Sequence, residues 1–190
     1  MAHAGLGSDW ECLFANDLSE KKAASYAANW GCDTLHVGDV ALIESSSLPS
    51  RADLAWASFP CQDLSLAGNG AGLGGSRSGT FWAFMGLISA LNAQERKPRM
   101  VALEKVYGAI TSHDGKDFEA MVHTVAAQGY RLGAMVIDAI HFLPQSRPRL
   151  FIVSIDRAWQ IPTACFETVP NPAWHPAAIH RAYNQLPKEL

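Results

Sequence analysis

Up to residue 155, short apolar runs alternate along the chain with longer stretches whose apolar residues recur at helical spacing. Short apolar runs that end in polar or turn-forming residues predict buried strands. The predicted strands span residues 11–15, 34–37, 53–58, 99–103, 130–142 and 150–155.

The longer stretches predict helices, because apolar residues three and four positions apart fall on one helix face. Ser19 is a good N-cap for the first helix, and Gly31 ends it. The predicted helices span residues 20–30, 80–93, 116–128 and, after a segment rich in proline, 176–185. Strands that alternate with helices are typical of an α/β fold with a mostly parallel sheet.

Four residues with chemically useful side chains each follow a predicted strand: Asp17, Asp39, Cys61 and Glu104. In open α/β sheets, ligands bind outside the carboxyl ends of the strands. We therefore expect three acids and one thiol to line a crevice at one edge of the sheet.

Composition fits one soluble domain, with 190 residues of which 48% are hydrophobic and 17% are charged. No apolar run is long enough to span a membrane, and residues 1–5 do not resemble a signal peptide, so we expect a cytoplasmic protein. The net charge of −3 neither indicates nor excludes a nucleic-acid partner. The cysteines form no CxxC pair, which argues against a metal site or a disulfide framework: Cys12, Cys32, Cys61 and Cys165.

Each candidate residue has a functional and a structural interpretation. Cys61 follows a proline and opens a glycine-rich loop, which suits a nucleophile, although most buried cysteines are only small apolar fillers. Glu104 can hydrogen-bond a base ring nitrogen, or it can be a buried acid paired with Lys105 or Arg147. Asp17 and Asp39 can bind a ribose and an amino group, or cap helices.

The alternating residues Gln145, Arg147 and Arg149 form a third candidate group. In an extended segment these side chains point to one side, where two guanidinium groups suit a phosphate or a base edge. The structural alternative is a surface strand with solvated charges.

Together these segments resemble the cytosine-C5 DNA methyltransferase family. Residues 58–65 resemble its nucleophile motif, residues 103–106 its Glu-Asn-Val motif, and residues 144–149 its Gln-x-Arg-x-Arg motif. Residues 14–17 and 38–40 resemble its two cofactor motifs, and the order and spacing agree from about residue 6 to residue 155.

The resemblance implies a Rossmann-like S-adenosylmethionine-dependent methyltransferase fold, mostly parallel, with an antiparallel hairpin near the end. The family's first strand, the central one of its sheet, and its Phe-x-Gly-x-Gly turn have no counterpart in residues 1–190. We therefore expect an incomplete catalytic core over residues 1–160, with an unpaired edge on each neighbour of the missing strand. Residues 161–190 are expected to begin a linker towards an absent target-recognition domain.

The family chemistry implies a role for each matching residue. Cys61 would add to C6 of a flipped-out cytosine, Glu104 would hold the base edge, and C5 would take the methyl group from S-adenosylmethionine. Arg149 would contact the cytosine and Arg147 would help to position it. The implied cofactor residues are Asp17, Leu18, Asp39, Val40 and Pro60, and the implied DNA contacts are Gln62, Ser65, Arg77 and Gln145.

Double-stranded DNA is the expected partner, as in bacterial restriction–modification, without a metal or a membrane; the sequence does not indicate an oligomeric state. One departure is Lys105 in place of the family's Asn, because a cation beside Glu104 can pair with it and oppose proton donation. Three alternatives stay open: an inactive remnant that acts as a binding module, a tRNA cytosine-C5 methyltransferase, and a cysteine hydrolase. The hydrolase would pair Cys61 with His113, for which the sequence suggests no orienting third group.

Overall fold

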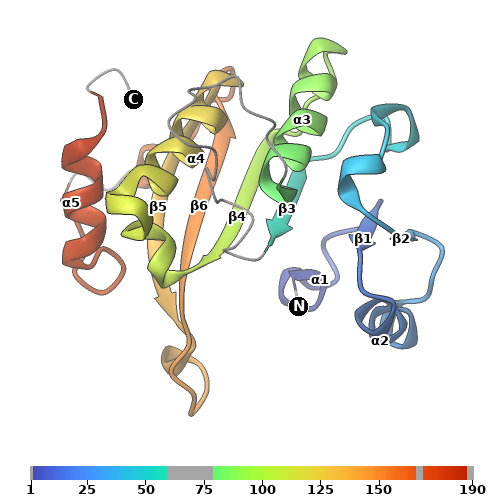
Figure 1. Ribbon diagram of the computed structural model, residues 1–190, viewed down its shortest axis with the longest axis horizontal. Coiled ribbons are helices and arrows are strands. Elements are labelled where there is room, and N and C mark those ends of the chain that lie inside the picture. The colour runs from blue at the N-terminus through green and yellow to red at the C-terminus, as the bar shows by residue number, and fades with distance from the viewer. Residues whose placement is uncertain (1, 60–78, 166–168, 188–190) are drawn as a thin grey trace.

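The computed structural model describes residues 2–59, 79–165 and 169–187. The described strands form two sheets (Figure 1). One has two strands in the order β1-β2, and the other has four strands in the order β3-β4-β6-β5. With helices between the strands, the chain has the expected α/β organisation.

The first part of the chain forms a small βαβ unit. It comprises α1 (Ala2–Leu6), β1 (Ala15–Asp17), α2 (Glu20–Trp30), β2 (Leu35–Val37) and two short 3-10 helices, η1 (Val40–Leu42) and η2 (Ser45–Ser47). β1 and β2 are parallel. The first strand begins at Ala15, later than the predicted 11–15, whereas α2 has the predicted bounds because Ser19 caps it and Gly31, at φ 79°, ends it.

The second part forms the larger sheet and its helices. The elements follow in the order β3 (Leu54–Ser58), α3 (Thr80–Ala93), β4 (Met100–Val106), η4 (Tyr107–Ile110), η5 (Ser112–Gly115), α4 (Lys116–Ala127), β5 (Tyr130–Asp138), η6 (Ala139–His141), β6 (Pro148–Asp156), η7 (Thr163–Cys165) and α5 (Ala177–Gln185). β3 is parallel to β4, whereas β6 is antiparallel to both β4 and β5. The antiparallel hairpin expected near the end is therefore confirmed.

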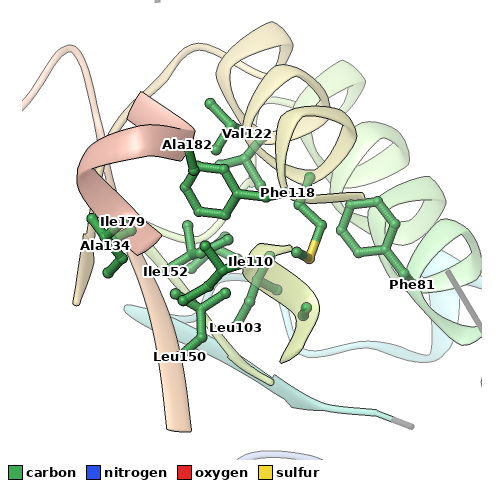
Figure 2. Packing of buried hydrophobic residues seen from close by; sticks show 14 of the residues in the cluster. Phe81, Leu103, Ile110, Phe118, Val122, Ala134, Leu150, Ile152, Ile179 and Ala182 are labelled. Atoms are coloured by element: carbon green, nitrogen blue, oxygen red, sulfur yellow. The ribbon is translucent and has the colours of Figure 1, made fainter. Parts of the chain in front are cut away.

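The hydrophobic core lies between one face of the larger sheet and three helices. Figure 2 shows Phe81 of α3, Phe118 of α4 and Ile179 of α5 converging on Leu103 of β4 and Ile152 of β6, and all five side chains are almost completely buried. Burial of each such side chain contributes roughly 1.5–3 kcal/mol. The helices therefore cover the face to which the odd-numbered residues of β4 point, which leaves the opposite face more accessible.

The small unit lies beside β3 and is joined to the larger sheet through α3 (Figure 1). Gln94, at the end of α3, donates from its side-chain amide to Ser45 Oγ at 2.9 Å, and Arg96 donates to the Ser45 carbonyl. Among the described strands, β1 pairs only with β2 and β3 only with β4. Each of these two strands thus has one edge without a strand partner in the described chain, which is the arrangement of edges that the sequence predicted.

The C-terminal segment is tied to the larger sheet. Ala178, Ile179 and Ala182 of α5 belong to the core, and Val136 of β5 donates its backbone N–H to the Trp174 carbonyl at 2.7 Å. The predicted helix 176–185 is confirmed apart from its first residue, because Pro176 is the N-cap. A domain boundary near residue 160 remains a proposal. Among the described helices, none combines the length and apolar character that crossing a membrane requires.

Candidate active site

The ends of β1 and β2 are held together at the edge where the acids were expected. Asn16 donates from its side-chain amide to the carbonyl oxygens of His36, at 3.1 Å, and Gly38, at 2.9 Å. Gly38 in turn donates its backbone N–H to the Asp17 carbonyl at 3.1 Å. The two segments that resemble cofactor motifs are therefore adjacent in space.

Asp17 and Asp39 both cap local backbone. Asp17 Oδ1 accepts from the backbone N–H of Ser19 at 2.8 Å, and Asp39 Oδ1 accepts from that of Ala41 at 2.9 Å, at the start of η1. The structural alternative of helix capping therefore holds for Asp39, the N-cap of η1, whereas Asp17 closes the turn before α2, whose N-cap is Ser19. The other oxygen of each carboxylate, Oδ2, accepts no hydrogen bond from any residue in the described ranges, so it is available to a ligand.

A cavity of about 790 Å³ lies between this edge and α3. Leu18 and Asp39 line it on one side, and Trp82, Met85 and Ser89 of α3 line it on the other. The volume is in the range of small-molecule sites. The lining combines apolar side chains with several polar ones, the latter being Asp39, Thr80, Ser89, Thr124 and Gln128. Leu18 is 70% exposed, so its side chain is open to a ligand in this cavity.

Two of the expected cofactor residues, Asp17 and Val40, adjoin the lining residues in sequence but do not line this cavity themselves. Trp82 was not predicted from sequence. A signal for it exists, since Trp82, Met85 and Ser89 recur at helical spacing on one face of α3, but that spacing alone is equally typical of core packing.

A second cluster lies on the accessible face of the larger sheet. Ser58 of β3 is opposite Glu104 of β4 in the parallel register, and its hydroxyl donates to Glu104 Oε2 at 2.8 Å. The Trp56 indole donates from Nε1 to Ser58 Oγ at 3.0 Å. Neither Trp56 nor Ser58 was predicted as a site residue. They are two residues apart in β3, so their side chains lie on the same face of the sheet.

Arg149 completes this cluster from β6. Phe151 is opposite Glu104 in the antiparallel register, and Arg149, two residues earlier in β6 and opposite Val106, lies on the same face. Its Nε is 3.8 Å from Glu104 Oε1, and both side chains are about a fifth to a quarter exposed, at 21% and 24%. Arg149 Nη1 donates to the Pro148 carbonyl, which fixes the guanidinium beside the acid. Glu104 and Arg149 therefore lie side by side, although the sequence had suggested Lys105 or Arg147 as the cation beside Glu104.

Gln145 and Arg147 are not in the strand. β6 begins at Pro148, so the single extended segment expected to carry Gln145, Arg147 and Arg149 is wrong: the first two lie in the loop that precedes the strand. No contact of either side chain with Glu104 occurs in the described chain. Hydrogen bonds to the Asp138 carboxylate, instead of strand pairing, hold this loop.

The Asp138 carboxylate organises this loop. Its Oδ1 accepts from the backbone N–H groups of Ile140, at 3.2 Å, and Arg147, at 2.5 Å, and its Oδ2 accepts from Ser146 Oγ at 2.8 Å. Desolvation raises the pKa of Asp138, but these hydrogen bonds and the nearby His141 outweigh it, and the net pKa lies below its ordinary value. The carboxylate is thus ionised at neutral pH.

Lys105 does not pair with Glu104, so the expected ion pair between them is wrong. The Lys105 side chain is 1% exposed and points to the core face, where Nζ donates to the Phe59 carbonyl at 3.2 Å and lies over the Phe59 ring at 4.1 Å. Successive residues of a strand point to opposite faces. The partner of Glu104 among the cations is Arg149.

The expected residues Pro60, Cys61, Gln62, Ser65 and Arg77 lie outside the described residues.

His113 has an orienting partner, contrary to the expectation from sequence. Its Nδ1 is 2.9 Å from Oδ2 of Asp117, a carboxylate that is 1% exposed and whose Oδ1 has no hydrogen-bond partner. The only other described contact of the ring is with Ser112 Oγ, so nothing ties His113 to the Ser58, Glu104 and Arg149 cluster. In the described ranges, no three His, Cys, Asp or Glu side chains gather closely enough to hold a metal ion.

Sequence comparison adds a family to this geometry. A family model described as C-5 cytosine-specific DNA methylase matches residues 1–188. The Type II methyltransferase M.BsuFI of Bacillus subtilis is 31% identical over 144 residues, which cover 75% of this chain and 33% of that protein. The Type II methyltransferase M.NgoBV of Neisseria gonorrhoeae is 30% identical over 171 residues, which cover 85% of this chain and 38% of that protein. The chain thus spans between a third and two fifths of the length of these relatives.

Structural comparison agrees on the fold. A mutant of Spodoptera frugiperda DNMT2 matches with a TM-score of 0.66 at 16% sequence identity, over 90% of this chain and 49% of that one. The α/β architecture is therefore the Rossmann-like methyltransferase fold that the motifs imply.

Proposed function

Because the chain belongs to the C-5 cytosine-specific DNA methylase family, we propose that it transfers a methyl group from S-adenosylmethionine to C5 of a cytosine in DNA, through a covalent adduct at Cys61. One observation carries this proposal: the 2.8 Å hydrogen bond from Ser58 to Glu104. This hydrogen bond holds the Glu104 carboxyl group at the end of β3. Three residues after Ser58 in the sequence comes Cys61, the only cysteine that stands in a Pro-Cys-Gln segment.

The chemistry requires a nucleophile and a group that holds the base. The Cys61 thiolate adds to C6, which breaks the C5–C6 double bond and makes C5 nucleophilic. Glu104 meets the ring nitrogen and the amino group of the flipped base, and Arg149 contacts its carbonyl edge. Loss of the C5 proton and departure of the Cys61 sulfur restore the double bond and free the enzyme.

The residues around the cavity fit the proposed cofactor. When bound, S-adenosylmethionine supplies an electrophilic methyl group on a sulfonium. Leu18 and Trp82 offer apolar walls for an adenine ring, and the second carboxylate oxygens of Asp17 and Asp39 are acceptors for ribose hydroxyls and an amino group. Of the expected cofactor residues, Val40 at the start of η1 and Pro60 after β3 complete the set by resemblance.

DNA contacts are proposed for Gln62, Ser65, Arg77 and Gln145, as the resemblance implies, with double-stranded DNA as the substrate. By the same resemblance, Arg147 helps to position the cytosine. The relatives are Type II methyltransferases, which supports a role in restriction–modification. Because the chain spans only part of those relatives, its activity by itself is part of the proposal.

The test measures transfer of a labelled methyl group to unmethylated plasmid DNA, which offers every short sequence context. We expect label in DNA with the unaltered chain, none with Cys61→Ala, and an unchanged rate with the matched control Cys32→Ala, whose thiol is exposed. A DNA containing 5-fluorocytosine should form an adduct with the unaltered chain that survives denaturation, since fluorine cannot leave C5 as a proton does.

Other outcomes select the alternatives. Label in unmodified tRNA and none in DNA would make tRNA the substrate. No label in either, with S-adenosylhomocysteine still bound in a calorimetric titration, would favour a binding module. Trapping of 5-fluorocytosine by Cys61→Ala would overturn the assignment of the nucleophile.

A further inference from the structure

We propose that Ser58 is a positioning residue: its hydroxyl, oriented by the Trp56 indole, fixes which oxygen of Glu104 meets the cytosine. The proposal rests on the proposed function, since it concerns the geometry of the same carboxyl group. It concerns two residues, Trp56 and Ser58, to which the motifs assign no role.

The direction of the two hydrogen bonds follows from the groups involved. An indole N–H only donates, so Ser58 Oγ accepts from Trp56 Nε1 at 3.0 Å. The one hydroxyl proton of Ser58 is then free to donate, and it lies on the 2.8 Å contact with Glu104 Oε2. The three side chains therefore form a directed chain from Trp56 through Ser58 to Glu104.

The sheet holds this chain in place. Trp56 and Ser58 are two residues apart in β3 and share a face, and Ser58 is opposite Glu104. The Trp56 ring packs edge-on against Phe151, with centroids 6.0 Å apart at 65°, and Phe151 is opposite Glu104 on β6. Three adjacent strands thus fix the indole, and the indole fixes the hydroxyl.

As a consequence, the two carboxyl oxygens of Glu104 have different hydrogen-bond partners. Oε2 is held as an acceptor by Ser58, whereas Oε1 is 3.8 Å from Arg149 Nε, beyond hydrogen-bond distance. When Glu104 carries a proton, that proton resides on Oε1, because Oε2 already accepts the hydrogen bond from Ser58. Oε1 is then the atom that donates to the base ring nitrogen, with Arg149 beside it.

The first measurement detects the hydrogen-bonded chain without relying on activity. The full chain with ¹⁵N-labelled tryptophan gives one indole resonance per tryptophan, and Trp56→Phe identifies the one from Trp56. We expect Ser58→Ala to shift the Trp56 indole proton upfield, because its acceptor is lost, and Ser58→Thr to leave it nearly unchanged. The matched control is Ser46→Ala, which removes another serine–glutamate hydrogen bond, the 3.2 Å contact with Glu44 Oε2 at η2, outside the larger sheet.

The second measurement tests the role by methyl transfer to unmethylated plasmid DNA. Ser58→Ala should lower kcat about tenfold, the scale of losing one hydrogen bond to a charged group, with KM for DNA within about twofold of the unaltered value. Ser58→Thr should restore kcat to within about threefold. The double variant Trp56→Phe/Ser58→Ala should be no slower than Ser58→Ala, because the indole acts through the hydroxyl. Urea midpoints of Ser58→Ala and Ser58→Thr should differ little from the unaltered value, because Ser58 is exposed. This comparison separates positioning from folding.

Each contrary result has a distinct meaning. An unmoved Trp56 resonance in Ser58→Ala, an unchanged kcat, or a failure of threonine to rescue would each overturn the positioning role while the unaltered chain still methylates DNA. Absence of methyl transfer by both the unaltered chain and Ser46→Ala, with the resonance shift present, would instead overturn the proposed function, and the positioning role with it.

Discussion

Lys105 Nζ lies 3.2 Å from the carbonyl oxygen of Phe59 and 4.1 Å from the centroid of the Phe59 ring. The ammonium group is buried, so it links β4 to the end of β3 inside the core instead of neutralising Glu104 on the other face. The substitution of the family's Asn by Lys105 is therefore a packing feature in this structure, next to the segment that carries Cys61.

We predict that Lys105→Met lowers the free energy of unfolding by about 1–3 kcal/mol, because it leaves a buried carbonyl without this donor. Methionine keeps most of the apolar stem, so little cavity forms. Urea denaturation measures the difference, with the exposed Lys21→Met as the matched control, for which we expect a change within about 0.5 kcal/mol. Equal stability of Lys105→Met and the unaltered chain would contradict the role of the Phe59 contact.

We predict that Asp138→Ala loosens the loop between β5 and β6, because three donors lose their shared acceptor. Amide exchange at Arg147 should become faster and methyl transfer slower. Asp138→Asn should be intermediate, since one side-chain oxygen remains as an acceptor. Unchanged exchange at Arg147 in Asp138→Ala would show that the loop is held by other contacts.

Because the pKa of Asp138 is lowered, we also predict that the stability of the protein depends on pH. The pKa of Asp138 is lower in the folded than in the unfolded chain, so its stabilising effect is fully present above the unfolded pKa and is lost as the pH falls through the folded value. The stability difference between the unaltered chain and Asp138→Ala should thus be constant near neutrality and shrink in acid below the ordinary aspartate pKa of 3.8. Urea midpoints at a series of pH values measure it, and a difference that grew in acid would contradict the sign.

We predict that Asp39→Asn weakens binding of S-adenosylhomocysteine about tenfold, as loss of one hydrogen bond to a charged group does. Asparagine can keep the cap to Ala41 through its oxygen while its amide replaces the second acceptor. Isothermal titration calorimetry measures the affinity, and Asp9→Asn, on the exposed N-terminal segment, is the control. Equal affinities would remove Asp39 from the cofactor site and leave it a cap only.

The sequence by itself determined the local elements of this protein. The bounds of α2 and α3 were predicted correctly, because caps and helical spacing are encoded in neighbouring residues. The strands before Asp39 and Glu104 were recognisable for the same reason, although β4 continues past Glu104 to Val106. The motifs also indicated the family, since five short segments in one order carry more information than any single residue.

Only the tertiary structure decided which of these residues meet. The order β3-β4-β6-β5 and its registers are non-local pairings, and they alone bring Ser58 opposite Glu104 and Arg149 diagonally beside it. Alternation along β4 was visible in the sequence, but which face the helices cover was not. Because the helices cover the face of the odd-numbered residues, Lys105 is buried and Glu104 stays partly exposed. Side-chain direction is a property of the strand, whereas burial is a property of what packs against it.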